Sequence, residues 1–261
     1  MLIVVSPARS LDYESPLATG KYSEPALLER SAELVDIMAT KSPAELSKML
    51  GVSQALAETS FERFQDWELP FTPDNARPAL LAFSGDVYVG MDASGTFSER
   101  DYSHAQKTLR ILSALHGVLR PLDLMQPYRL EMGTKLKTSA GRDLYDFWGS
   151  EITEVLQEAI DDSPGPKLLI NLASNEYFNA VRLDELTVPV ITPTFLDRKG
   201  GTGDYRLVAF FAKRARGAMA GWIIRNRVKS IRGLQSFEGL GYLRAPERST
   251  PHQPVFIRDN T

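Results

Sequence analysis

The sequence predicts a mixed α/β domain, because short buried strands and amphipathic helices are interspersed along the whole chain. Runs rich in β-branched or aromatic residues are the expected strands: Leu2–Val5, Ala79–Phe83, Leu168–Leu172, Val190–Phe195, Tyr205–Phe211 and Val255–Ile257. They do not follow the regular βαβαβ order of a doubly wound sheet. We therefore expect one α/β domain in which strands and helices mix irregularly.

The expected helices have recognisable start signals. Ser42–Glu45 supplies an N-cap, a first-turn proline and a glutamate at the third helical position. Ser98–Asp101 begins a second helix, which we expect to run to Gly117 with an apolar face of Tyr102, Ala105, Leu109, Leu112 and Leu115. Further helices are expected over Leu144–Asp161 and Lys213–Lys229, and Gly200–Gly203 is expected to be a strand-linking turn. Residues 24–66 form an early helical subregion.

Composition narrows the functional classes. The chain has no cysteine, which excludes disulfides, thiolate nucleophiles and cysteine-based metal sites. Its histidines are not spaced as a metal-binding pair, so we expect neither a metal nor a cofactor. The first residues lack the basic start of a signal peptide, and no window is apolar enough for a membrane span. The expected location is the cytoplasm.

Positive charge is concentrated in one stretch of a chain whose formal net charge is −3. Residues 198–232 hold ten lysines and arginines and a single acid, Asp204. A local excess of this kind is typical of a surface that binds a polyanion. The alternative is a solvated surface that pairs with the acidic surplus elsewhere, and we favour the functional surface because the excess spans a strand, a turn and a helix.

The expected helix from Lys213 has distinct faces. At 100° per residue, one narrow basic face holds Lys213, Arg216 and Arg227. A core stripe is formed by Ala215, Met219 and Trp222, and a second basic edge by Arg214, Arg225 and Lys229. Small residues at Gly217, Ala218, Ala220 and Gly221 would let another backbone or a ligand come close.

Residues 42–64 predict two short helices joined by a tight turn, in which Gly51 can take positive φ and Ser53 can cap the second helix. A major-groove helix-turn-helix is disfavoured because the second helix carries Glu58 and Glu62. A helix-hairpin-helix needs no basic side chain, since its backbone N–H groups bind phosphate. A plain pair of helices has the same pattern and remains an alternative.

Polar residues gather at the predicted strand ends and in the central loop. Ser6, Tyr128, Asn171 and Ser174 could converge near Arg129 and form an anion pocket. The alternative is that these groups satisfy backbone polar atoms around a proline-rich loop. A catalytic use of the pocket keeps an enzyme hypothesis open, although no catalytic residue can be named.

Six motifs lie in a consistent order along nearly the whole chain: Ser6–Asp12, Phe83–Tyr88, Gly117–Gly133, Asn171–Phe178, Phe211–Gly217 and Gly239–Tyr242. Together they resemble the YaaA family of bacterial peroxide-stress proteins. The resemblance implies a single domain over residues 1–261, of unusual topology, with a basic cleft and a helix-hairpin-helix element. It also implies protection against peroxide damage and binding of double-stranded and branched DNA, largely without sequence specificity.

On this resemblance the DNA-binding residues are expected to be Arg9, Gly51, Val52, Ser53, Arg120, Arg129, Lys213, Arg214, Arg216, Arg225, Arg227 and Lys229. The chain departs from the family pattern at Arg9, where lysine is more usual, and at Ser53, where helix-hairpin-helix motifs more often have a second glycine. Arginine keeps the positive charge but could not serve as a deprotonated amine.

Two other functions remain open. The first is an enzyme that acts on a phosphorylated or nucleotide-like substrate through Arg9, Tyr128, Arg129 and Ser174. The second makes the basic surface a docking site for an acidic protein. A binding protein without cofactor, acting on DNA, is the function we favour.

Overall fold

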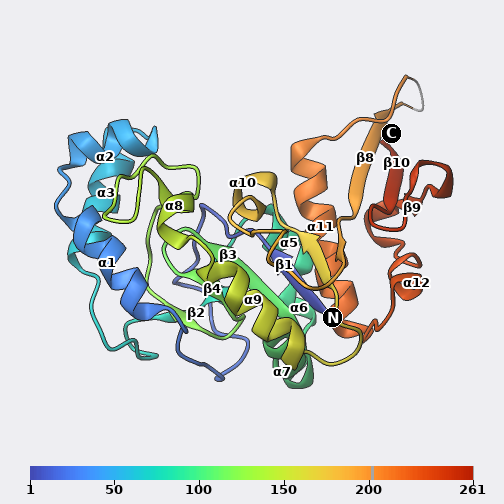
Figure 1. Cartoon of the computed structure of the whole chain (residues 1–261), viewed down its shortest axis with the longest axis horizontal. Coiled ribbons are helices and arrows are strands. Elements are labelled where there is room, and N and C mark those ends of the chain that lie inside the picture. The colour runs from blue at the N-terminus through green and yellow to red at the C-terminus, as the bar shows by residue number, and fades with distance from the viewer. Residues whose placement is uncertain (201–202, 261) are drawn as a thin grey trace.

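A five-stranded sheet lies at the centre of the computed structural model, which describes residues 1–200 and 203–260 (Figure 1). Its strand order is β4-β3-β1-β6-β7. The strands are β1 (Leu2–Val5), β3 (Leu109–Ser113), β4 (Gly117–Leu119), β6 (Leu169–Leu172) and β7 (Val190–Ile191). Neighbouring strands run parallel except for β4, which is antiparallel to β3.

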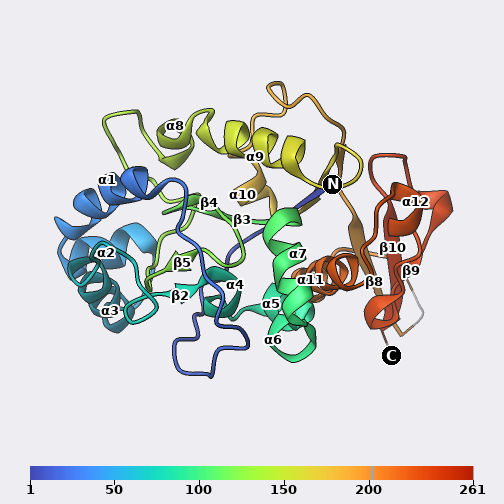
Figure 2. The same cartoon turned by 90° about the horizontal axis from the view of Figure 1, so that it is seen from below.

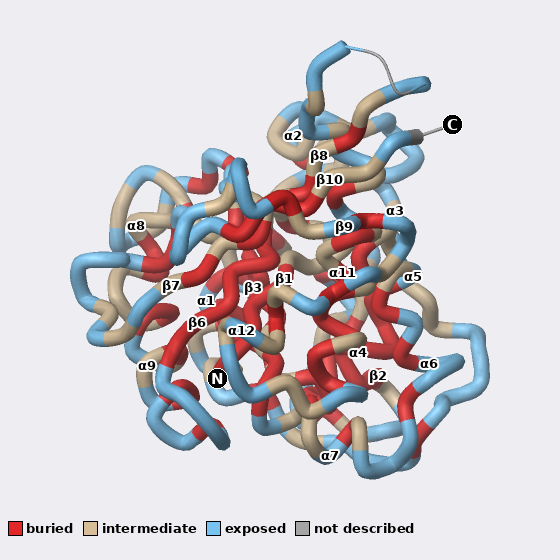
Figure 3. Tube along the Cα trace, turned by 90° about the vertical axis from the view of Figure 1, so that its right-hand side faces the viewer, coloured by how far each residue is buried: buried red, intermediate tan, exposed pale blue. Residues whose placement is uncertain are grey.

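Both faces of this sheet are covered, which explains why its strands are continuous apolar runs rather than alternating ones. Every residue of β1 and β6 is buried, as the red segments of Figure 3 show. Helix α9 (Glu151–Asp162) lies on one side of the sheet and α5 (Asp86–Met91) on the other (Figure 2).

The order of the parallel strands contains a reversal. The chain passes from β1 to β3 on one side, and later returns to place β6 on the other side of β1. In open α/β sheets, ligands bind at the carboxyl ends of the strands that flank such a switch point. The sequence did not predict this organisation, because a long helical insertion separates β1 from β3.

Two smaller sheets complete the strands. β10 (Val255–Asn260) lies between β8 (Thr194–Lys199), which is parallel to it, and β9 (Leu243–Arg244), which is antiparallel. This C-terminal sheet packs beside α11 (Ala209–Arg225), and its ring contacts join Phe195, Phe237 and Phe256. The third sheet pairs β2 (Arg77–Pro78) with β5 (Leu124–Met125).

The remaining helices are α1 (Leu28–Ala39), α2 (Pro43–Leu50), α3 (Gln54–Gln65), α4 (Ala79–Ala82), α6 (Ala93–Thr96), α7 (Glu99–Thr108), α8 (Leu144–Trp148), α10 (Asn175–Phe178) and α12 (Ile231–Leu234), with 3₁₀ turns at Gly239–Gly241 and Pro246–Arg248. Capping boxes at Ser42 and Ser98 are confirmed, as is the helical character of the early subregion. Among the described residues, none of the helices has the length and apolar character that a membrane span requires.

Two predicted strands are wrong. Ala79–Phe83 contains the single helical turn α4, because Ala-Leu-Leu-Ala after Pro78 are good helix formers and a short apolar run has no diagnostic period. Tyr205–Phe211 is not a strand either: α11 begins at Ala209, and Arg206 makes only an isolated bridge to Asp197. The predicted strand over Val190–Phe195 is divided between two sheets, with Pro193 in the break.

Three predicted helices have different bounds. The helix from Ser98 ends at Thr108, and Leu109–Ser113 is a strand, buried except for the partly exposed Arg110, whose apolar residues fit either period. Gly149, with φ of +48°, separates α8 from α9. Helix α11 spans residues 209–225 rather than 213–229. The turn expected at residues 200–203 lies partly outside the described residues.

Candidate functional site

A pocket of about 310 Å³ lies at the carboxyl ends of β1 and β6, where the strand order reverses. Its lining comes from the segment after β1, the start of α5, the central loop, the segment after β6, and α11. The lining residues are Ser6, Pro7, Ala8, Arg9, Ser10, Gly85, Asp86, Val87, Tyr128, Arg129, Leu130, Glu131, Leu172, Ser174, Glu176, Tyr177, Lys213 and Arg216.

Hydrogen bonds fix the strand ends that form the inner wall of the pocket. The Ser174 N–H donates to Ser6 Oγ at 2.8 Å, and the Ser6 hydroxyl donates to Ser174 Oγ at 3.2 Å. The Tyr128 hydroxyl, 2.7 Å from Ser113 Oγ, ties the central loop to the end of β3. Burial raises the pKa of Tyr128 and of Tyr177, so both phenols stay neutral and can offer hydrogen bonds.

A contact between two helices brings α11 to the pocket. An alanine Cβ at Gly217 would lie 1.7 Å from the Val87 carbonyl oxygen, so the backbones of α11 and α5 touch there. The prediction that small residues permit a close approach is therefore confirmed, and the partner is α5. This crossing places Lys213 and Arg216 beside Asp86, at the first turn of α5.

The pocket contains four basic and three acidic side chains. Glu131 accepts a hydrogen bond from Arg9 and lies 3.5 Å from Arg129 Nη2. Lys213 and Arg216 have no ion pair or side-chain hydrogen bond with any residue in the described part of the chain. Burial lowers the pKa of Arg216, which means that desolvation acts on this guanidinium without a compensating carboxylate.

The structure therefore brings together Ser6, Arg9, Tyr128, Arg129, Ser174, Lys213 and Arg216. Asn171 does not line the pocket: it is buried, accepts from the Ala173 N–H, and contacts Thr192. Arg120 is also absent, because Asp123 and the Glu24 carbonyl bind its guanidinium elsewhere.

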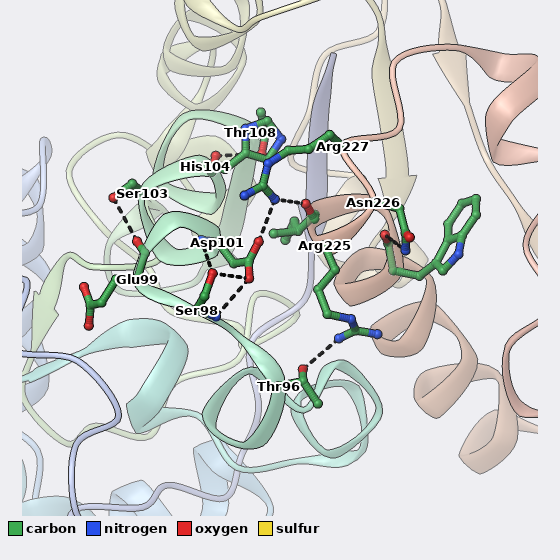
Figure 4. Close-up of polar contacts among 12 residues, drawn as sticks. Thr96, Ser98, Glu99, Asp101, Ser103, His104, Thr108, Arg225, Asn226 and Arg227 are labelled. Atoms are coloured by element: carbon green, nitrogen blue, oxygen red, sulfur yellow. Dashed lines mark hydrogen bonds and ion pairs between the residues drawn. The ribbon is translucent and has the colours of Figure 1, made fainter.

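The basic stretch does not form one surface. Arg227 follows the end of α11 with φ of +51° and forms an ion pair with Asp101 at 2.7 Å (Figure 4). It therefore does not share a face with Lys213 and Arg216. Arg225 donates to Thr96 Oγ1, also seen in Figure 4. The prediction of one basic face is wrong because it assumed that the helix continued past residue 225.

The other cations of this stretch are also dispersed. Arg214 does not line the pocket and lies 4.0 Å from Asp86. Lys229 is exposed beyond the helix, and Arg198 pairs with Asp259. These acids are distant in sequence, and a local count of charges could not reveal them. Arg216 and Lys213 are the part of the stretch that reaches the pocket.

The turn between α2 and α3 has the expected geometry. Gly51 has φ of +64°, and Ser53 caps α3 through the Leu56 N–H. The Gly51 and Val52 N–H groups both donate to the Ser47 carbonyl, which leaves the free donors at Ser53 and the first turn of α3. Figures 1 and 2 place this turn and α11 at different ends of the long axis, and the turn does not line the pocket.

Sequence reasoning missed two acids of the pocket, Asp86 and Glu176. Glu176 accepts a hydrogen bond from the Gly133 N–H at 3.1 Å and fixes the far end of the central loop. The small residues of α11 were the available signal for Asp86, since they indicate a crossing helix. The described residues contain no group of three or more acidic, histidine or cysteine side chains arranged to hold a metal ion.

Comparison with known proteins identifies the family. The sequence model of the family described as peroxide stress protein YaaA matches residues 1–248. The chain belongs to this family. It is 52% identical to a UPF0246 protein of Hahella chejuensis over 260 residues, covering 100% of both chains. UPF0246 proteins of Alteromonas mediterranea and Cellvibrio japonicus are 50% and 48% identical over 259 residues, with 98% or more of each chain covered.

Membership confirms the resemblance found in the motifs and supports a role connected with peroxide stress. It also places the pocket within the shared region, since all of its lining residues fall between Ser6 and Arg216. The chemistry of the lining residues indicates which kind of ligand the pocket can hold.

Proposed function

We propose that this protein binds duplex and branched DNA in the cytoplasm during peroxide stress, and that its pocket takes phosphate oxygens. One observation carries the proposal: Lys213 and Arg216 lie without an anionic partner, among the described residues, beside Arg129 in a pocket at the switch point. Arginine offers forked donors to phosphate and lysine a compact charge. Neither recognises a base in this position, so little sequence specificity is expected.

Removing the unpaired cations is expected to weaken DNA binding. Lys213→Ala should reduce the slope of log affinity against log salt by about 0.9, the value for one lost phosphate contact. Arg216→Ala should lower affinity about tenfold, as expected when a charge-assisted hydrogen bond is lost. Fluorescence anisotropy on one duplex at several salt concentrations measures both effects.

Arg232→Ala is the matched control, because Arg232 belongs to the same basic stretch but is exposed on α12 and does not line the pocket. It removes the same charge from a different site. Equal losses in Arg216→Ala and Arg232→Ala would mean that net charge, and not the pocket, governs binding.

We propose the turn at Gly51–Ser53 as a second phosphate contact, through the free N–H groups at the start of α3. Ser53→Asp keeps a good N-cap but adds a negative charge at the donors, whereas Ser53→Asn keeps the cap without charge. We expect Ser53→Asp to bind DNA several-fold more weakly and Ser53→Asn to match the parent in the same anisotropy assay. Identical affinities of the two variants would exclude the turn from the interface.

The pocket geometry also favours a second candidate, an enzyme for a phosphorylated or nucleotide-like substrate. A pocket lined by serines and neutral tyrosines at a switch point is where α/β enzymes hold such substrates. A thermal-shift screen with nucleotides and sugar phosphates separates the candidates, since a ligand of the folded state raises the melting temperature. Stabilisation by a small phosphate together with an absence of DNA binding would favour the enzyme.

A further inference from the structure

The cations of α11 do not line up along one face. Arg214 faces Asp86, the exposed Arg225 keeps its charge and donates to Thr96, and Arg227, just beyond the helix, pairs with Asp101. A strand that ran along the helix would need one cation after another to follow its phosphates, which carry one charge per about 3.4 Å of strand. Helix α11 instead directs two unpaired cations, Lys213 and Arg216, into a single pocket.

Hydrogen bonds hold together the strand ends that form the inner wall of this pocket. Ser6 and Ser174 are hydrogen-bonded to each other across the ends of β1 and β6, and the buried Tyr128 lies beside them. Because the Ser6 hydroxyl donates to Ser174 Oγ, the Ser174 hydroxyl proton remains available to a ligand. A terminal phosphate has one ester link to lead out of a pocket, whereas a phosphodiester within a strand has two.

Two arginines of the pocket lack full partners. The Arg129 side chain is 17% exposed, its buried Nε has no hydrogen-bond partner among the described residues, and its contact to Glu131 is long at 3.5 Å. Arg216 has no anionic partner among the described residues. Arg216 is partly exposed, so the cost of an unsatisfied buried group falls on Arg129 Nε, and an anion with several oxygens would supply partners for both arginines.

The pocket holds four basic and three acidic side chains, a formal excess of one positive charge, so the number of free oxygens is what separates the two kinds of phosphate. Glu131 is shared by Arg9 and Arg129, and Glu176 is engaged with the Gly133 N–H. A phosphomonoester carries about −1.5 to −2 charges near pH 7 and three free oxygens, whereas a diester carries one charge and two free oxygens. The monoester matches Arg129, Lys213 and Arg216 with one oxygen for each.

We propose that the pocket receives a phosphomonoester at the end of a DNA strand, as at a strand break, rather than a phosphodiester within a continuous strand. This inference rests on the proposed function, because it names the part of DNA that the pocket holds. Duplex contacts outside the pocket then position the end, and the terminal phosphate enters between α11 and the central loop.

Four duplexes of one sequence test the inference: one closed at both ends by hairpin loops, one with hydroxyl ends, one with 5′-phosphates and one with 3′-phosphates. We expect at least one phosphorylated duplex to bind about tenfold more tightly than the closed and hydroxyl-ended duplexes, in line with one or two added charge-assisted hydrogen bonds. A deoxynucleoside monophosphate should compete, and the unphosphorylated nucleoside should not.

Arg216→Ala should abolish the preference for the phosphorylated end, and Arg232→Ala should retain it. If all four duplexes bind equally well, the strand-end inference is overturned while DNA binding stands. If no duplex binds, both the inference and the proposed function are overturned, whatever the effect of the monophosphate. If Arg216→Ala keeps the preference, the end is recognised outside this pocket and the inference is wrong.

Discussion

Replacing Gly217 by alanine is expected to destabilise the protein by about 3 kcal/mol, at the upper end of the usual cost of overpacking a core. The new Cβ would lie 1.7 Å from the Val87 carbonyl oxygen and 2.7 Å from its carbon. Both atoms belong to the backbone of α5, so no side-chain rotation can relieve the overlap. The two helices must separate, and each loses close-packed contacts.

Gly20→Ala is the control for this variant. Gly20 is exposed, no heavy atom lies within 4 Å of a Cβ placed there, and its φ is not in the left-handed region. We expect the Gly20 variant to stay within about 0.5 kcal/mol of the parent, and the midpoint of urea unfolding compares the two. A Gly217 variant as stable as the Gly20 variant would contradict the backbone contact.

The same crossing determines the geometry of the pocket. A Cβ at Gly90 would lie 2.1 Å from the Arg214 carbonyl, and one at Gly221 would lie 2.6 Å from the Met91 carbonyl. Gly217 is therefore one of three glycines at which α5 and α11 approach. Since Lys213 and Arg216 precede Gly217 on α11, separation of the helices would also move both cations away from the central loop.

Elements with strong local signals could be predicted from the sequence. Ser42 and Ser98 begin helices because a capping residue acts within its own turn. Strand β1 was found as an uninterrupted apolar run, and β6 as an apolar run that contains one polar residue, Asn171. The segment after Ser98 was predicted wrongly, because Leu109–Ser113 is buried except for the partly exposed Arg110. Its apolar residues Leu109, Ile111 and Leu112 fit a helix as well as a strand.

The site was partly predictable for a topological reason. Ser6 and Ser174 follow buried strands, and the carboxyl ends of adjacent parallel strands meet at one edge of a sheet. Whether each cation has an acidic partner was not predictable. Arg227 and Arg216 are equivalent in a count of charges, yet Asp101 neutralises the first and no described acid pairs with the second, because pairing depends on tertiary contacts.

Lowering the pH from 7 to 5 is expected to cost about 2 kcal/mol of stability through His116 alone. This residue is fully buried between the rings of Phe71 and Tyr128. The Ser31 hydroxyl donates to the Leu27 carbonyl, so His116 Nδ1 is the donor to Ser31 Oγ at 2.9 Å. Its Nε2 is then the unprotonated nitrogen, which is buried and has no hydrogen-bond partner in the described part of the chain.

Burial lowers the pKa of His116 from 6.5 to about 3 in the folded protein. Between these values the unfolded chain binds a proton that the folded chain does not. Stability is therefore complete above pH 6.5 and falls as the pH drops, by about 1.4 kcal/mol per pH unit. The neighbouring Tyr128 does not add to this slope, because burial raises its pKa and it is neutral throughout the range.

Urea unfolding at pH 5, 6 and 7 measures the slope, and His116→Gln removes its source. We expect this variant to be less stable than the parent at pH 7, because it loses ring packing, yet to lose about 2 kcal/mol less between pH 7 and pH 5. His252→Gln, which replaces an exposed histidine in the same way, is the control for the substitution itself. If His116→Gln and the parent lose stability in parallel, the proton is taken up elsewhere and His116 does not control acid unfolding.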